Sequence, residues 1–338
     1  MFAILYLAFL TAMMGRNVLP LGMQKILYPI GTVWMGFMLY LTVYFLITDI
    51  GYVVKHLPPS TVYRRVQLIT GYVLVSILLV YGNYQFNHPK IVEHAIAIHR
   101  EGAKKQTLKI VAVSDFHLGV QIDKKQLHKY VQLINAQQPD VILIAGDLID
   151  NNILPLNLEK MEEEINRLQA PLGIYFCLGN HEYLSGIEGS KAFLRKTNLT
   201  VLVDSVATIA DDVQIIGRDD KQGNPNRLSL KEVKGIGCKV EGVCDPSSST
   251  LITILLDHEP YNLEEAEAAG IDLQFSGHTH HGQVFPFNKL VEHLFEVGYG
   301  YKQKGNTGVY VTSGLGLWGP PFRIGTQSEI VVVKLVIN

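Results

Sequence analysis

The chain is poor in charged residues and in cysteine. Charged residues make up 18% of its 338 residues, and only three are cysteines. So few cysteines exclude a small fold held together mainly by disulfides. A hydrophobic content of 48% excludes a disordered protein. The net charge is −2 and no basic stripe is present, so nothing in the composition favours nucleic-acid binding.

The shortage of charge is confined to the N-terminal quarter of the chain. Residues 1–89 hold six charged side chains, whereas the remaining 249 residues hold 54, close to the norm for soluble proteins. The first part carries a net charge of +4 and the second a net charge of −6. This contrast predicts an apolar segment over residues 1–89, a connector over 90–106 and a globular domain over 107–338, and it excludes a simple soluble enzyme.

Two apolar runs in the first segment predict a helical hairpin across a membrane. Ile26–Ile50 is uncharged except for Asp49, and as a helix it would reach ~37 Å, more than a ~30 Å hydrocarbon core. Val66–Tyr81 is uncharged but short for a full span, which leaves a buried core helix as its alternative. A third run, Met1–Met14, has no basic region before it, which disfavours a signal peptide. Whether that run is a complete span stays open.

Basic residues near these runs give a slight indication of orientation. They are Lys55, Arg64 and Arg65 in the hairpin loop, and Arg16 and Lys25 on the opposite side. With the loop in the cytoplasm, the globular part lies outside. In an oxidising compartment we expect Cys238 and Cys244 to form a disulfide. In a reducing compartment they would stay free thiols.

Beyond residue 106, short apolar runs alternate with helical patterns, which predicts an α/β fold. The opening strands are expected at Leu108–Val113, Val141–Ala145 and Ile174–Leu178, with helices at Lys124–Asn135 and Leu158–Leu168. Continuous apolar strands are typical of a sheet that is covered on both faces. Later strands are expected at Val201–Val203, Val213–Ile216, Leu251–Leu255, Leu273–Phe275, Val309–Thr312 and Ile330–Val336, and helices at Leu230–Lys234, Asn262–Ala269 and Leu290–Glu296.

Polar residues that can bind metals follow five of the expected strands. These blocks are Ser114–His117, Gly146–Asp150, Gly179–Glu182, Asp257–Pro260 and Gly277–Gln283. Open α/β sheets place their ligand sites at the carboxyl ends of strands. Carboxylates combined with imidazoles suit Mn²⁺, Fe or Zn²⁺ better than Mg²⁺ or Ca²⁺, and the blocks contain no cysteine for a structural thiolate zinc site. Each block alone is ambiguous, but five in order predict a metal centre.

The five blocks resemble the motif set of the calcineurin-like metallophosphoesterases: D-x-H, G-D-x-x-D, G-N-H-[DE], H and G-H-x-H. The resemblance covers roughly Leu108 to Asn338, and the apolar N-terminal segment is similar to that of the bacterial membrane-associated branch. It implies a four-layer α/β/β/α sandwich preceded by two or three transmembrane helices. It also implies two divalent ions, Mn, Fe or Zn, ~3.5 Å apart. One departure is His281, where that branch often has glycine.

The resemblance also implies a role for each matching residue. One metal would be held by Asp115, His117, Asp147 and His280, and the other by Asp147, Asn180, His258 and His278. His181 resembles the family's catalytic histidine, which stabilises phosphoryl oxygens or protonates the leaving group. Asp150 would orient His181, and its alternative is a surface residue that caps a helix.

These roles together imply a membrane-anchored, dinuclear metal-dependent phosphoesterase. It would cleave a phosphodiester or pyrophosphate bond with metal-activated hydroxide. The membrane anchor favours an amphiphilic, lipid-linked substrate, and a UDP-diacylglucosamine pyrophosphohydrolase is one option within the family. The alternative is a catalytically inactive binding or scaffold protein on the same fold. Such a protein should have lost ligands, yet all seven ligand positions are intact.

Weaker candidates for substrate binding lie outside the metal blocks. They are Arg218, His281 and Arg323. Arg218 could hold a phosphate, but a structural ion pair with an acidic neighbour is an equal alternative. Aromatic residues near the last block could form an apolar wall for a lipid-like substrate, enter the membrane interface, or simply pack between loops. These aromatic residues are Phe285, Phe287, Trp318 and Phe322.

Overall fold

The computed structural model describes residues 7–8, 10–11, 14–15, 18–55, 60–210, 212–240 and 251–338. The chain divides into two compact units. The helical unit comprises the described residues up to His88 together with Trp318–Ile324, and the α/β unit comprises Pro89–Leu317 and Gly325–Asn338. Most of Met1–Met14 lies outside the described residues. So does Cys244, and only the backbone of Cys238 is described.

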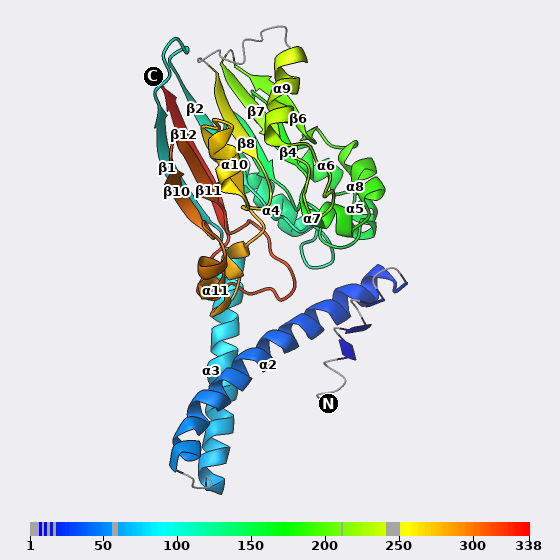
Figure 1. Cartoon of the computed structure of the whole chain (residues 1–338). Coiled ribbons are helices and arrows are strands. Elements are labelled where there is room, and N and C mark those ends of the chain that lie inside the picture. Colours follow the sequence, from blue (N-terminus) through cyan, green and yellow to red (C-terminus); the bar gives the residue numbers. More distant parts are fainter. Residues whose placement is uncertain are drawn as a thin grey trace. The chain divides into compact units, whose positions relative to one another are not determined.

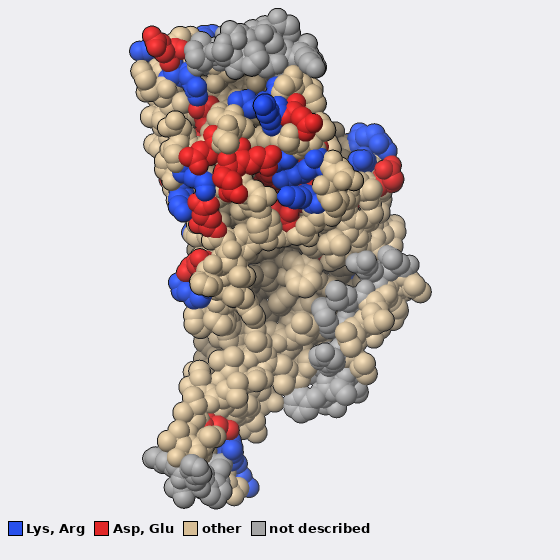
Figure 2. Space-filling view, in the orientation of Figure 1, with Lys and Arg blue, Asp and Glu red and all other residues tan. Residues whose placement is uncertain are grey.

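The helical unit contains two long helices, α2 (Leu21–Lys55) and α3 (Thr61–Asn87). Ser60 caps α3, where its hydroxyl accepts a hydrogen bond from the Tyr63 N–H at 3.2 Å. Both helices are long and apolar enough to cross a membrane, and each is longer than its apolar run. Figure 2 shows charged side chains over the α/β unit, while the visible face of the two helices is almost free of them.

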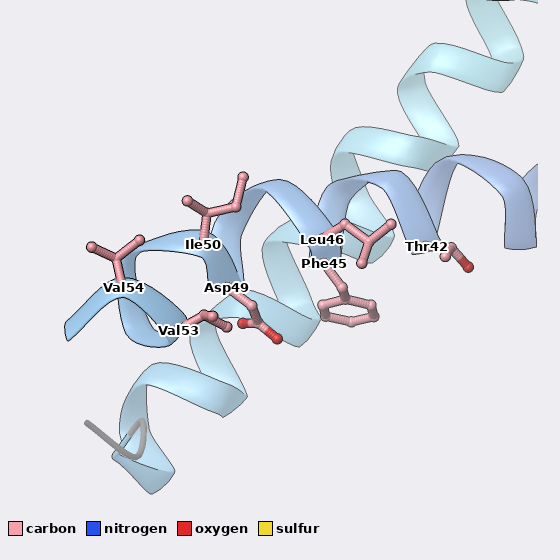
Figure 3. A pocket seen from close by; sticks show the side chains of 7 residues that line it. All are labelled: Thr42, Phe45, Leu46, Asp49, Ile50, Val53 and Val54. Atoms are coloured by element: carbon pink, nitrogen blue, oxygen red, sulfur yellow. The ribbon is translucent and has the colours of Figure 1, made fainter. Parts of the chain in front are cut away.

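The two helices pack through small and polar residues. A Cβ on Gly71 would lie 2.8 Å from the Tyr44 ring, so glycine allows this close approach. Near the hairpin end, Arg64 Nη1 lies 2.8 Å from the Asp49 carboxylate and Gln67 Nε2 donates to it at 2.7 Å. A groove on α2 beside Asp49 contains none of the predicted site residues (Figure 3). Its lining consists of Thr42, Phe45, Leu46, Asp49, Ile50, Val53 and Val54.

A short segment from the C-terminal part of the chain, Trp318–Ile324, completes the helical unit. Phe322 packs against Gly36 of α2, and Ile324 packs against Gly82 of α3. The Arg323 N–H donates to the Gly82 carbonyl at 2.9 Å, which anchors the segment through its backbone. No pattern in the sequence predicts this pairing, because the segment lies more than 230 residues from α3 in the chain.

The α/β unit is built on two six-stranded mixed sheets (Figure 1). The first has the order β1 (Lys90–Ile98), β12 (Glu329–Ile337), β2 (Gln106–Val113), β3 (Val141–Ala145), β4 (Ile174–Cys177) and β5 (Thr200–Leu202). The second has the order β10 (Gly300–Lys304), β11 (Thr307–Val311), β9 (Leu273–Ser276), β8 (Ile252–Leu256), β7 (Val213–Gly217) and β6 (Ser205–Ile209). Strands β2 to β5 are parallel, as are β7, β8, β9 and β11.

The main core lies between the two sheets. Leu108 and Ile110 of β2 pack there with Ile254 of β8 and Phe275 of β9. The alternate residues of β2, such as Val111, face the other way and are equally buried, so both faces of this sheet are covered. Full burial of each such side chain stabilises the fold by roughly 1.5–3 kcal/mol. Helices outside the two sheets confirm the α/β sandwich that the sequence predicts.

The helices of this unit follow the strands in chain order. They are α4 (Lys124–Asn135), α5 (Leu154–Glu159), α6 (Glu162–Ile165), α7 (Asn180–Leu184), α8 (Ile187–Leu194), α9 (Leu230–Val240), α10 (Leu263–Ala268), the 3₁₀ turn η1 (His280–Gly282) and α11 (Phe287–Leu294). Residues of α9 and α10 pack on the outer side of β7 and β8. The single helix expected over Leu158–Leu168 is instead two helices, α5 and α6, because Lys160 has a left-handed φ of 52°.

The structure also differs from the expected connector over residues 90–106. Lys90–Ile98 forms β1, which pairs in parallel with the whole of β12. Its side chains alternate between half-buried and exposed, because β1 is an edge strand. The strands β6 and β10 were likewise not expected, and β10 has three exposed residues of five. These three edge strands carry too few buried apolar side chains for a sequence pattern to reveal them.

Candidate metal centre

All five polar blocks meet at the carboxyl ends of their strands. They follow β2, β3 and β4 in the first sheet and β8 and β9 in the second. Backbone groups join the blocks: the Asp115 N–H donates to the Gly146 carbonyl at 3.0 Å, and the His278 N–H donates to the Asp115 carboxylate at 3.1 Å. The two sheets therefore contribute to a single cluster of side chains.

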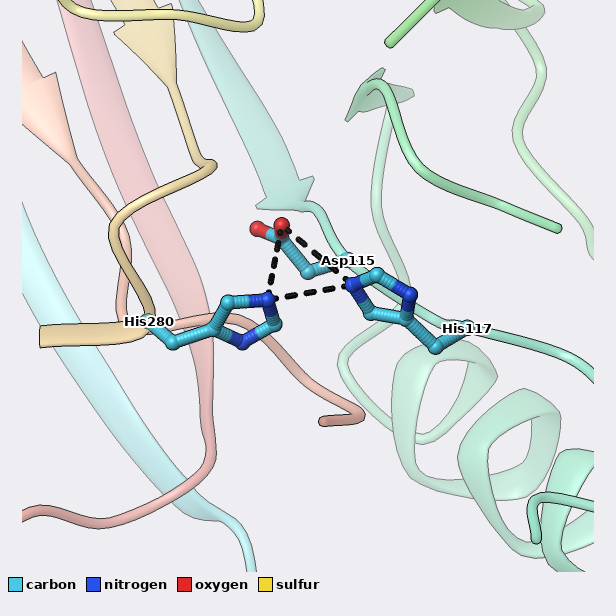
Figure 4. A group of neighbouring side chains, drawn as sticks. All are labelled: Asp115, His117 and His280. Carbon is cyan, nitrogen blue, oxygen red and sulfur yellow. Dashed lines mark hydrogen bonds and ion pairs between the residues drawn. The ribbon is translucent and has the colours of Figure 1, made fainter. Parts of the chain in front are cut away.

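One group of ligand atoms comes from Asp115, His117 and His280 (Figure 4). The Nε2 atoms of the two histidines face one another at 3.0 Å. Asp115 Oδ1 lies 3.4 Å from His280 Nε2 and 3.8 Å from His117 Nε2. Two neutral imidazoles with their lone pairs this close repel each other unless a cation or a proton lies between them. Either a shared proton or a metal cation therefore suits this position beside the Asp115 carboxylate.

A second group forms around Asp147. His258 Nε2 lies 3.1 Å from Asp147 Oδ2, while its Nδ1 donates to the Ala145 carbonyl at 2.7 Å. Because a carbonyl can only accept, the proton of neutral His258 is on Nδ1, and Nε2 keeps its lone pair for a ligand. His278 Nδ1 lies 3.3 Å from Asn180 Oδ1, which brings the remaining two predicted ligands together.

The backbone is strained at most of these positions. Five of the seven predicted ligands have φ between 48° and 68°, a backbone conformation that residues other than glycine rarely adopt. They are Asp115, His117, Asp147, His278 and His280. Each such residue costs on the order of 1 kcal/mol, and strain of this kind gathers at functional sites. Glycines make room beside them: a Cβ on Gly277 would clash with the Asp115 carboxylate, and one on Gly179 with that of Asp147.

Glu182 holds the backbone of two ligand-bearing loops in place, and the sequence pattern alone does not predict this role. Its buried carboxylate accepts hydrogen bonds from the N–H groups of Asp147 at 3.1 Å, Ile149 at 3.0 Å and Gly179 at 2.7 Å. Burial and the nearby Asp147 carboxylate raise the pKa of Glu182 to about 8, whereas the N–H donors favour its anion. Glu182 therefore joins the loops after β3 and β4. The one feature of the sequence that pointed to Glu182 is its position next to His181 in the third polar block.

His181 lies beside the ligand groups with one nitrogen already engaged. Its Nδ1 donates to the backbone carbonyl of Asp150 at 2.5 Å. The Asp150 carboxylate is 3.7 Å from this nitrogen and 3.5 Å from His117 Nδ1, so it lies between two imidazoles. Burial and the neighbouring His117 lower the pKa of His181 below its usual value. Asp150 therefore contacts His181 mainly through its backbone.

Two carboxylates at the centre stay negatively charged despite their burial. Burial alone would raise the pKa of Asp147, but the adjacent His258 lowers it well below the usual range of an aspartate. The pKa of Asp115 is also lowered: burial opposes this, and His280 and His117 cause it. Paired anions surrounded by imidazoles are a donor set that fits divalent Mn, Fe or Zn. His258 Nε2 supports this fit, since it is buried and lies only 3.1 Å from the Asp147 carboxylate.

A comparison with known protein families agrees with this chemistry. The model of the calcineurin-like phosphoesterases matches residues 108–282, just over half of the chain. The chain belongs to the calcineurin-like phosphoesterase family. This region contains all seven predicted ligands, which confirms the resemblance stated from the sequence.

Several curated relatives of this calcineurin-like phosphoesterase are metallophosphoesterases by name. An uncharacterized metallophosphoesterase of Campylobacter jejuni is 34% identical over 78% of this chain and 68% of its own length. One from Bacillus subtilis is 30% identical over 75% of this chain and 89% of its own length. A zebrafish transmembrane protein with metallophosphoesterase domain is 31% identical over 80% of this chain, and the match spans 62% of that protein. With the two apolar helices, this relative supports membrane association.

The weaker candidates have other partners in this phosphoesterase. Arg218 is almost fully buried, with Nη1 2.9 Å from Glu265 and 3.6 Å from Asp257. The His281 ring stacks on Tyr299 with centroids 4.2 Å apart, and its Nε2 lies 3.0 Å from Glu292. Arg323 belongs to the Trp318–Ile324 segment of the helical unit and is fully buried. Phe322 is also packed there, whereas Phe285, Phe287 and Trp318 are exposed.

Proposed function

We propose that this chain is a membrane-anchored phosphoesterase that uses two divalent metal ions to hydrolyse a phosphodiester or pyrophosphate bond. The observation that carries the proposal is the convergence of seven ligand side chains from five strand ends, with the Nε2 atoms of His117 and His280 only 3.0 Å apart. Family membership supports the same reaction class.

The ligand set divides around Asp147. The first ion would be held by Asp115, His117, Asp147 and His280, and the second by Asp147, Asn180, His258 and His278. When bound, divalent ions supply positive charge that offsets the charge of phosphoryl oxygens and favours deprotonation of water near neutral pH. The protein holds the ligands in place through the N–H donors to Asp115 and through Glu182.

His181 is the proton donor in this proposal. Its Nδ1–H is fixed by the Asp150 carbonyl, so Nε2 is the nitrogen left to exchange a proton with a leaving-group oxygen. Asp150 acts as a positioning residue for both His181 and His117. Arg218 and Arg323 are structural in this proposal, because each is buried and Arg218 is paired with carboxylates.

The substrate is proposed to be amphiphilic. Two helices able to cross a membrane keep the α/β unit close to lipid, since α3 ends at Asn87 and β1 begins only three residues later at Lys90. Nucleic acid is not expected as a substrate. The α/β unit is proposed to lie on the outer side of the membrane. This orientation follows from the small excess of basic residues in the hairpin loop, which favours a cytoplasmic loop.

The test is metal-restored hydrolysis by the full chain in detergent. The chain should be stripped with a chelator and then assayed on bis-p-nitrophenyl phosphate and p-nitrophenyl phosphate with Mn²⁺, Zn²⁺, Fe²⁺ or Mg²⁺. We use the full chain because a soluble fragment that begins at residue 102 would lack β1, which pairs with β12 in the first sheet. We expect no activity without metal, recovery with Mn²⁺, Fe²⁺ or Zn²⁺, and a preference for the diester.

A catalytically inactive scaffold is the competing function. It predicts that the folded, metal-loaded chain hydrolyses neither substrate, and the same result with a lipid-linked phosphodiester would favour it over an enzyme.

A further inference from the structure

Helix α11 presents an apolar face to its surroundings. Phe287, Leu290 and Leu294 are 43%, 51% and 64% exposed, and Phe285 just before the helix is 50% exposed. Spacings of three and four residues place the three helical side chains on one face. Large exposed apolar patches are uncommon on water-facing surfaces and mark sites that contact a membrane or another protein.

The other side of α11 holds the loop that carries the metal ligand His280. Glu292 Oε1 lies 3.0 Å from Nε2 of His281, the residue directly after that ligand. Asn288 is buried, and its backbone approaches Gly282 so closely that no Cβ would fit there. Helix α11 therefore packs on the metal loop by one face and leaves its apolar face about half exposed.

The residues that follow the Trp318–Ile324 segment pack on the loop just before α11. Ile324 packs against Gly82 of α3, and the next residue, Gly325, packs against Phe285. Thr326 then donates to the Gln283 carbonyl at 2.7 Å. Phe285 thus contacts Gly325, and Gly325 directly follows the Trp318–Ile324 segment of the helical unit. The helices of that unit are long and apolar enough to cross a membrane. This continuity favours a bilayer, rather than a second protein, as the partner of the bare face.

We propose that Phe285 and the apolar face of α11 insert into the bilayer surface beside the metal loop. The consequence for catalysis rests on the function proposed above: a phosphate ester in a lipid headgroup would reach the metal loop without leaving the membrane. The polar face of α11 carries Lys289 and Glu292 as an ion pair at 2.8 Å, so its charges largely cancel. Insertion should therefore not need anionic lipids.

The first experiment measures contact with lipid directly. In the full chain, Trp34 and Trp318 are replaced by phenylalanine, and one tryptophan is introduced as Leu290→Trp or, as the matched control on the polar face, Lys289→Trp. Each chain is placed in nanodiscs of phosphatidylcholine with acyl chains brominated near the headgroup. We expect L290W fluorescence to be quenched by about twofold or more, and K289W fluorescence to be quenched far less. Equal quenching, or none in L290W, overturns the proposal.

The second experiment measures the effect on turnover. The double variant Leu290→Gln with Leu294→Gln is compared with the exposed control Leu158→Gln of α5. Both are assayed on a p-nitrophenyl phosphodiester of diacylglycerol in phosphatidylcholine nanodiscs and on bis-p-nitrophenyl phosphate in water. We expect the double variant to lose about tenfold on the lipid substrate and to keep its activity on the soluble one. Equal changes on both substrates overturn the link to catalysis.

The two experiments separate this inference from the proposed function. If the parent chain hydrolyses neither substrate with any metal, the proposed function fails, while the quenching result still decides whether α11 meets the bilayer. If the parent is active and L290W is not quenched, the enzyme stands and the insertion surface is overturned.

Discussion

The helical unit and the α/β unit each contain a cluster of polar side chains, and the two clusters differ in how those side chains are paired. In the helical unit, Asp49 meets Arg64 and Gln67, so each acceptor faces a donor. In the α/β unit, the Nε2 atoms of His117 and His280 face each other at 3.0 Å, and the buried Nε2 of His258 lies 3.1 Å from the Asp147 carboxylate. The first cluster stabilises a helix pair. The second gathers imidazole nitrogens and carboxylate oxygens within ligand distance of one another, which is the donor set of a candidate cation site.

The largest effect should come from Asp147→Asn. This change removes the charge shared by both proposed ions, and we expect activity to fall by ~10³-fold or more because metal-held charge is worth several kcal/mol. The matched control is Asp123→Asn at the start of α4, where either residue caps the helix equally well. Rates on bis-p-nitrophenyl phosphate and a thermal melt decide the case. Substantial residual activity in D147N would defeat the mechanism.

His181→Ala should have the next largest effect, and the effect should depend on the leaving group. Without its proton donor, we expect the enzyme to lose ~10²-fold or more on an alkyl leaving group and much less on nitrophenolate, which leaves unprotonated. The control is the surface variant His128→Ala. Equal losses on both leaving groups would contradict a proton-donor role.

The same residue predicts a pH dependence. The pKa of His181 is lowered by burial and by His117, so its protonated form is lost as pH rises through a value below 6.5. The rate on an alkyl leaving group should therefore fall with rising pH in that range, and the nitrophenyl rate should not. A parallel pH profile for both substrates would speak against His181 as the acid.

Glu182→Gln should weaken the α/β unit rather than the chemistry alone. The new amide would turn an N–H₂ group toward a backbone N–H, and leaving buried donors unpaired costs about 1–3 kcal/mol. We expect a lower Tm for the α/β unit, with Glu163→Gln on the surface as the control. An unchanged Tm would show that the loops after β3 and β4 do not depend on this carboxylate.

The smallest effect on the active site should come from the helical unit. Gly71→Val would push a side chain against the Tyr44 ring and disturb the pairing of α2 with α3. We expect hydrolysis of a soluble diester to change by less than about twofold, because the ligand groups all lie in the other unit. A large loss would show that the two units are coupled.

Much of the fold and site could be predicted because the signals are local. Buried parallel strands such as Val141–Ala145 are continuous apolar runs, and the ligand residues follow them directly in the chain. The edge strands β1 and β10 could not be predicted, since the side chains of β1 alternate between half-buried and exposed and three of the five in β10 are exposed. The role of Glu182 was also hidden, because its three partners are backbone N–H groups that any sequence possesses.

The sequence by itself determined the membrane-compatible helices, the positions of the inner strands along the chain and the chemical identity of the ligands. Each of these depends on a pattern only a few residues long. Only the tertiary structure decided which of these groups meet. It placed His280 against His117 across 163 positions, paired Arg218 with Glu265, and built Trp318–Ile324 into the helical unit. Such contacts depend on how strands and loops distant in the chain pack together, and no local pattern records that.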